Sequence, residues 1–256
     1  MTRYTPLLIL ALLLSLPFRA QVISIDVDTD QPSLSFRTGK DVLGYLHQTY
    51  RNGPCKAYTF SQKNTHYRND SIVGTSEWQE AIEFPDKFRI DFGDKAGGNY
   101  VIFKNDSSYR YKNFELRGKK HDANVLLLLL GGMYYRELPD VIARLQSGGY
   151  NTAVLSRQKW NRRKVYVIGA EAGDMSSNQI WVSKKTWRVV RIIERLEGNN
   201  MMDMSFDSFQ EHCKGYVETK VTFKRNGKTE QVEEYDAIRS VEKFPEDVFN
   251  PAPVKK

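Results

Sequence analysis

Short stretches of alternating apolar and polar residues follow one another from Lys56 to Phe244, and turns rich in Gly, Asn and Asp separate them. Phe88, Ile90 and Phe92 illustrate the pattern, because the residues between them are charged. Alternation with a period of two residues is typical of a half-buried strand in an antiparallel sheet. The pattern therefore predicts a mainly β (α+β) protein whose strands form one continuous meander. Only one face of this sheet is expected to be exposed to solvent.

The expected strands share this alternation or a high content of β-branched and aromatic residues. They cover residues 56–65, 72–81, 87–92, 100–104, 109–116, 150–156, 164–169, 179–183, 187–196, 202–209, 216–225 and 230–241. The strongest turn signal is Asn226-Gly227, because a two-residue hairpin turn with positive φ at both positions suits Asn followed by Gly. A sheet of about ten or more twisted strands is expected to be strongly curved, as an unclosed half-barrel whose concave face is covered by helices.

Two segments predict helices. Asp41 to Tyr50 has one apolar face and stops at a Gly-Pro pair, and Pro139 to Ser147 begins with proline and stops at Gly148-Gly149. The apolar run Val125 to Leu130 has the length of a buried strand or a lid segment rather than of a helix.

The N-terminus has the features of a cleavable secretion signal. Arg3 precedes the apolar run Leu7 to Leu16, and Ala20 precedes a polar Gln21. The run is shorter than the roughly 20 residues that span a bilayer, although an N-terminal anchor or a buried helix is the alternative. Residues 1–20 are therefore expected to be a signal peptide and residues 21–256 a single domain. The mature protein is expected in the periplasm without a stable transmembrane segment.

Charge and composition narrow the function classes. The chain has 38 Lys and Arg against 31 Asp and Glu, a mild excess that specifies no partner. The basic residues cluster most densely at Arg157, Lys159, Arg162, Arg163 and Lys164. They lack both a nucleic-acid-binding motif and interleaved aromatic residues, so they are expected to be a solvated strand end, and no nucleic-acid partner is expected.

Cys55 and Cys213 are the only cysteines. In an oxidising compartment they would either form a disulfide or remain as two thiols, and the sequence leaves both alternatives open. They lack the C-x-x-C spacing of a redox centre or a zinc knuckle.

No enzymatic motif is present. The four histidines do not form an H-E-x-x-H pattern, and no G-x-S-x-G elbow, P-loop or dinucleotide-binding glycine pattern occurs. The sequence therefore predicts no catalytic residue, no metal site and no cofactor. An unrecognised hydrolase is the least favoured alternative, because residues from distant segments can also form a site.

Five short segments resemble the periplasmic lipoprotein-carrier superfamily of LolA, LolB and LppX-like proteins. They are TFSQ (59–62), EFPDKFRIDF (83–92), NYVIFKNDSSYRYKN (99–113), QIWVSKKTWRVVRII (179–193) and FPEDVFNP (244–251). The order is also similar, with a leading helix before the first strand and a second helix in mid-chain. The chain differs in its longer N-terminal stretch, Gln21 to Lys40, and in the run Val125 to Leu130.

The resemblance implies an unclosed β-barrel over helices, with an apolar cavity that shields the acyl chains of a lipid or lipoprotein. It also implies inner- and outer-membrane transport components as partners, and a role in outer-membrane biogenesis. Apolar and aromatic residues of the strands and the second helix are the expected lining of this cavity. They are Phe88, Ile90, Phe92, Phe103, Tyr109, Tyr111, Val141, Leu145, Trp181, Met202, Met204 and Phe206. Methionine suits such a lining because its flexible side chain adapts to irregular apolar shapes, although these residues would equally fill an ordinary core. A structural or partner-binding envelope protein on the same scaffold is the alternative function.

Overall fold

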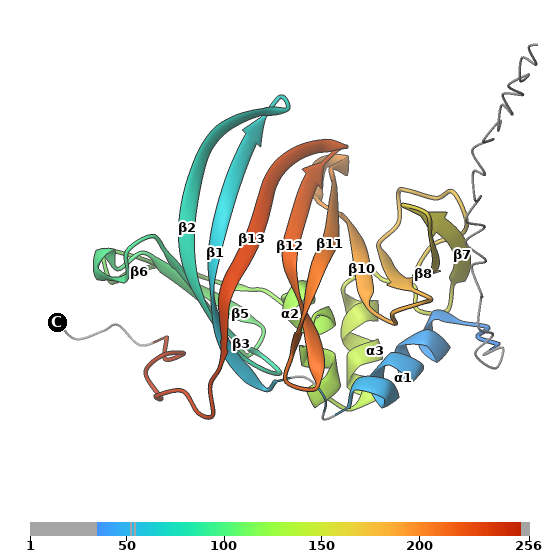
Figure 1. Ribbon diagram of the computed structural model, residues 1–256, viewed down its shortest axis with the longest axis horizontal. Helices are drawn as coiled ribbons and strands as arrows, with labels where there is room; N and C mark the ends of the chain where they lie inside the picture. The colour runs from blue at the N-terminus through green and yellow to red at the C-terminus, as the bar shows by residue number, and fades with distance from the viewer. Residues whose placement is uncertain (1–34, 52, 54, 252–256) are drawn as a thin grey trace, which may run out of the picture. The chain divides into compact units, whose positions relative to one another are not determined.

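The computed structural model describes residues 35–51, 53 and 55–251, and the expected signal peptide therefore lies outside the described residues. Within this part, thirteen strands form one sheet in which all neighbours are antiparallel (Figure 1). The strands are β1 (Ala57–Arg68), β2 (Ser71–Glu83), β3 (Lys87–Phe92), β4 (Tyr100–Lys104), β5 (Ser107–Lys112), β6 (Glu115–His121), β7 (Leu155–Trp160), β8 (Arg163–Ile168), β9 (Gln179–Ser183), β10 (Val189–Arg195), β11 (Met201–His212), β12 (Gly215–Arg225) and β13 (Lys228–Ser240).

The sheet consists of two meanders rather than the single one expected. Its strand order is β6-β5-β4-β3-β2-β1-β13-β12-β11-β10-β9-β8-β7. The first and last strands, β1 and β13, pair at the centre, and β6 and β7 are the two edges of an open sheet. Among the described residues, one α-helix, at residues 39–50, precedes β1, and two α-helices lie between β6 and β7, in the connection that leads from one edge of the sheet to the other.

Most expected strands are confirmed within a few residues, and two are wrong. The expected strand 109–116 is broken by a turn at Asn113 and Phe114, both with positive φ, and the exposed edge strand β6 follows it. The expected strand at 150–156 begins only at Leu155, because the preceding residues form turns. The hairpin at Asn226-Gly227 is confirmed, with both residues at positive φ.

Three α-helices accompany the sheet: α1 (Gly39–Tyr50), α2 (Val125–Leu129) and α3 (Leu138–Ser147). A capping box begins α1, because the Thr38 side chain accepts from the Asp41 backbone while the Asp41 carboxylate accepts from the Thr38 backbone. The expectation that Val125 to Leu130 is a buried strand or a lid segment rather than a helix is wrong in its choice against a helix. Asn124 caps a short helix there by accepting from the backbone N–H of Leu127.

The helices pack on one face of β8 to β12, which we call the inner face. The main apolar core joins Val42 and Leu43 of α1, Leu129 of α2 and Val141 of α3 to strand residues such as Ile192. Figure 1 shows the three helices gathered together, with the β1–β2 hairpin extending well beyond them. No helix in the described part of the chain has both the length and the apolar character to cross a membrane.

The expectation that one face of the sheet is exposed to solvent is wrong in two regions, where both faces are buried. In β8 to β10, side chains such as Val167 and Trp181 that point away from the inner face are also buried. On β4 and β5, Tyr100 and Tyr111 pack against Phe244 and Phe249 of the segment after β13. Runs of consecutive apolar residues in the sequence are typical of strands buried on both faces.

Candidate functional site

A cavity of about 650 Å³ lies between the helices and the ends of several strands. Its wall includes the β4–β5 turn, the end of β6, both α2 and α3, and one residue of β10. The lining includes Phe103, Asp106, Asp122, Val125, Leu127, Leu128, Arg136, Asp140, Ala143, Arg144, Tyr150 and Glu194. The cavity thus combines an apolar wall with charged groups.

The apolar wall comes mainly from α2. Val125, Leu127 and Leu128 line the cavity, and Leu127 and Leu128 also contact two different apolar clusters. Phe103 of β4 extends this wall and stacks on Phe88 with ring centroids 5.6 Å apart. The leucine-rich segment therefore forms a wall that belongs to both the core and the cavity.

An ion-pair network joins α3 to the β4–β5 turn at the edge of the cavity. Arg144 donates to both carboxylate oxygens of Asp106, at 2.7 and 2.8 Å, and to Asp140 at 3.0 and 3.1 Å. Arg136 also donates to Asp140, at 3.1 Å. Burial raises the pKa of the Asp140 carboxyl, but the hydrogen bonds and charges of Arg144 and Arg136 together outweigh it and hold the pKa below its usual range. One guanidinium nitrogen of Arg144, Nη1, reaches Asp106 and another, Nε, reaches Asp140, so a single arginine joins α3 to the β4–β5 turn through charge-assisted hydrogen bonds.

Among the carboxylates that line the cavity, Glu194 is the one on a strand, β10. It lies directly opposite Met202 of β11, and its carboxylate accepts a hydrogen bond of 2.9 Å from the hydroxyl of Tyr150. Burial raises the pKa of Glu194, the Tyr150 hydrogen bond lowers it, and the charge of Asp122 raises it further.

The residues expected to line a lipid cavity are not all brought together. Phe103 lines the cavity, and Phe88 packs beside it. The residues of β11 and α3 lie in the main core on the inner face; they are Val141, Leu145, Met202, Met204 and Phe206. All of these except Met202 expose 3% of their surface or less, so in this conformation they pack against the protein itself.

The remaining expected residues lie elsewhere. Phe92 makes an edge contact with Trp78, and Ile90 is half-buried on the same strand. Tyr109 and Tyr111 pack in the cluster under the segment after β13. Trp181 lies on the outer side of β9, where its indole donates to Gln179 at 2.9 Å.

Three buried glutamates lie on the long central strands. Glu80, Glu218 and Glu233 expose 5%, 7% and 7% of their surface. Glu233 accepts hydrogen bonds from Gln231 and Tyr235, both at 2.6 Å, whereas Glu80 Oε1 has no partner among the described residues. Burial raises the pKa of Glu218 to about 8 and that of Glu233 to about 7. Burial and the two neighbouring carboxylates raise the pKa of Glu80 well above its usual value.

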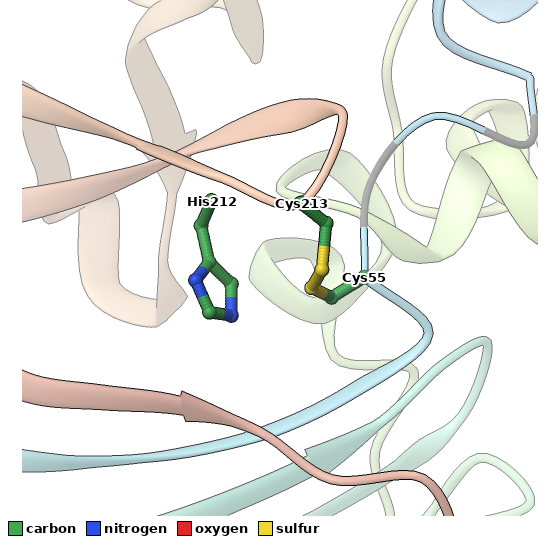
Figure 2. A group of neighbouring side chains, drawn as sticks. All are labelled: Cys55, His212 and Cys213. Atoms are coloured by element: carbon green, nitrogen blue, oxygen red, sulfur yellow. A yellow bond between two sulfur atoms is a disulfide. The ribbon is translucent and has the colours of Figure 1, made fainter.

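Cys55 and Cys213 form a disulfide with a Cα–Cα distance of 5.4 Å, which decides between the alternatives that the sequence left open. Figure 2 shows His212 beside the two sulfur atoms, and the ligand atoms of the three residues lie within 4.8 Å of one another. Cysteine binds metal ions as a thiolate, and a disulfide offers none. In its oxidised form this group therefore ties the start of β1 to the β11–β12 turn.

The charged residues of the cavity were not predicted from the sequence. Asp140 and Arg144 are four residues apart within α3, a spacing that places them on one side of the helix and could have been noticed, whereas Arg136 precedes the helix in extended backbone. Asp106 and Glu194 carry no such signal, because only the fold brings them to the cavity.

No family model matches the chain, and no curated protein matches it in sequence. Solved structures match most of it. A DUF1329 family protein from Desulfovibrio piger has a TM-score of 0.58 at 14% identity, over 83% of this chain and 95% of that one. A LolA superfamily protein from Nitrosomonas europaea has a TM-score of 0.56 at 11% identity, over 83% and 97%. An outer membrane lipoprotein-sorting protein domain from Vibrio parahaemolyticus has a TM-score of 0.52 at 9% identity, over 81% and 94%. The chain therefore shares the LolA-like fold that the sequence resemblance predicted.

Proposed function

We propose that the protein is a non-catalytic periplasmic carrier that shields the acyl chains of a lipid or lipoprotein. The cavity of about 650 Å³ beside the leucine-rich α2 is the observation that carries this proposal. The fold shared with a lipoprotein-sorting domain supports the same reading and adds a role in outer-membrane lipoprotein sorting. On this proposal the sheet acts as an unclosed half-barrel, and the helices on its concave face form the cover of the binding site.

The free energy gained by burying an acyl chain is large enough for the protein to carry it without a covalent bond. Each buried CH₂ group contributes about 0.8 kcal/mol, so a chain of some fourteen carbons would gain on the order of 10 kcal/mol before the cost of ordering it. The acyl chain enters along Phe103, Val125 and Leu128, and it displaces core contacts of Met204 and Leu145 when the helices part. Transport components of the inner and outer membranes would load and unload it.

A variant that fills the cavity tests this proposal. Ala143 lies on the exposed side of α3 and lines the cavity, so Ala143→Trp would occupy the space without altering the core. We expect it to weaken the binding of a fluorescent fatty acid at least about tenfold. Gln146→Trp, at an exposed position of the same helix outside the cavity lining, is the control and should bind as the wild type does. Equal binding by folded Ala143→Trp and wild-type protein would refute the cavity assignment.

One observation favours the alternative of a partner-binding envelope protein. Ile72 and Val73, beside the turn of the β1–β2 hairpin, expose 64% and 56% of their surface. Native mass spectrometry of protein purified from an envelope fraction distinguishes the two functions by the presence or absence of bound lipid. The carrier is expected to retain lipid, and the partner-binding protein is not.

A further inference from the structure

The charges that line the cavity are unequal. Three side chains are permanently cationic, namely Lys104, Arg136 and Arg144, whereas five are carboxylates, namely Asp86, Asp106, Asp122, Asp140 and Glu194. The cavity is therefore acidic although the whole chain has a formal net charge of +7. If the cavity prefers cations, the preference comes from the carboxylates of its lining, because the net positive charge of the whole chain would repel a cation.

Four of the five carboxylates already have cationic partners. Asp106 and Asp140 pair with Arg144, as described above, and Asp86 lies 3.9 Å from Arg136. Asp122 pairs with Lys120, with an N–O distance of 3.2 Å.

Glu194 differs from these four. Within the part of the chain that the structure describes, no lysine, arginine or histidine pairs with it, and its hydrogen bond comes from the neutral hydroxyl of Tyr150. Asp122 adds a repulsive charge, as its effect on the pKa of Glu194 indicates. A partly buried carboxylate beside a second carboxylate is stabilised by a cation that brings hydrogen-bond donors.

We propose that Glu194 is an anionic subsite that binds the ammonium group of an amine-bearing amphiphile whose acyl chain lies against α2. The inference rests on the proposed carrier function and names the ligand class of its cavity. Glu194 and Val125 both line the cavity, so one ligand can contact the carboxylate and the apolar wall together. An ammonium group suits the site because it brings a positive charge and three N–H donors to a carboxylate whose hydrogen bond among the described residues comes from the neutral Tyr150 hydroxyl.

Two probes with the same alkyl chain test the proposal. The affinities of dodecylamine and dodecanol are measured by displacement of the neutral fluorescent probe N-phenylnaphthylamine from the full-length mature protein. We expect the wild type to bind the amine about tenfold more tightly than the alcohol. Glu194→Gln keeps the side-chain shape and an acceptor for Tyr150, and it should abolish this preference by lowering the affinity for the amine to that for the alcohol. Glu197→Gln, at an exposed glutamate just after β10, is the matched control and should keep the preference.

Each outcome decides between the proposals. Equal affinities of the wild type for amine and alcohol, or a preference that survives Glu194→Gln, would overturn the ammonium subsite and leave the carrier function standing. Failure of the folded wild type to bind the fluorescent probe, the amine and the alcohol would overturn both. Thermal melting of each variant shows that it is folded.

Discussion

At the scale of single residues, the central strands carry carboxyl groups where an apolar side chain would be expected. Glu218 exposes 7% of its surface, and burial raises its pKa to about 8. The folded protein therefore keeps a proton that the unfolded chain releases above its ordinary pKa of 4.5. The folded state binds more protons between these two values, so the free energy of unfolding falls as the pH rises from 4.5 to about 8.

Glu218→Gln removes this titration, because the amide stays neutral. We expect the variant to gain stability relative to the wild type as the pH rises from 5 to 8, by about 1–3 kcal/mol in total. Urea denaturation at a series of pH values measures the difference. Glu211→Gln on the neighbouring strand is the control, because this exposed carboxylate is in water in both states. A constant difference between Glu218→Gln and wild type across this range would contradict the prediction.

At the scale of elements, the contact between α3 and the β4–β5 turn depends on Arg144 and Asp106. Their side chains expose 27% and 33% of their surface, so solvent screens the pair only in part. Exposed ion pairs contribute about 0–1 kcal/mol, whereas partial burial and a charge-assisted hydrogen bond strengthen an interaction. The pair is therefore expected to stabilise the position of α3 without dominating the stability of the fold.

A double-mutant cycle tests this pair. We expect Arg144→Ala and Asp106→Ala to couple by about 0.5–1 kcal/mol in the free energy of unfolding. Arg117 and Glu115 of β6 form a more exposed pair, with exposed fractions of 53% and 66%, and should couple less. Faster hydrogen exchange in α3 of Arg144→Ala would show that the helix has been released. Coupling no larger than that of the control pair would contradict the prediction.

At the scale of the whole molecule, the disulfide joins the start of the first meander to the second. Cys55 and Cys213 are 158 residues apart in the sequence, so their bond restricts a large loop in the unfolded chain. A crosslink that closes a loop lowers the entropy of the unfolded state, and the effect grows slowly with the loop length. The bond also lies close to the site at which the central β1–β13 pairing begins.

Removing this crosslink is expected to destabilise the protein by about 2–5 kcal/mol in the variant with both Cys55→Ser and Cys213→Ser. Denaturation with and without a thiol reductant measures the effect. Reductant should lower the free energy of unfolding of the wild type towards that of the double variant. The stability of the double variant should not change when reductant is added. Full reduction of the wild type, shown by thiol titration, without loss of stability would count against a stabilising role.

The sequence alone determined most strands, two of the three helices and the Asn226-Gly227 hairpin. These features depend on side-chain periodicity, caps and turn residues that lie within a few positions of each other. It also indicated the LolA-like fold through short segments such as EFPDKFRIDF, which the matching solved structures support. The helix at Val125 was misjudged, because a short apolar run suits a strand and a helix equally well.

Only the tertiary structure decided which side chains meet at the cavity. Asp106 and Glu194 lie on opposite sides of the chain midpoint, and no local pattern relates them, yet both line the cavity next to α3. The same holds for the pairing of Cys55 with Cys213 and for the separation of Trp181 from Met204 on the two faces of the sheet. Local periodicity assigns a residue to a face of its own strand, whereas the register and order of the strands determine which distant residues share that face.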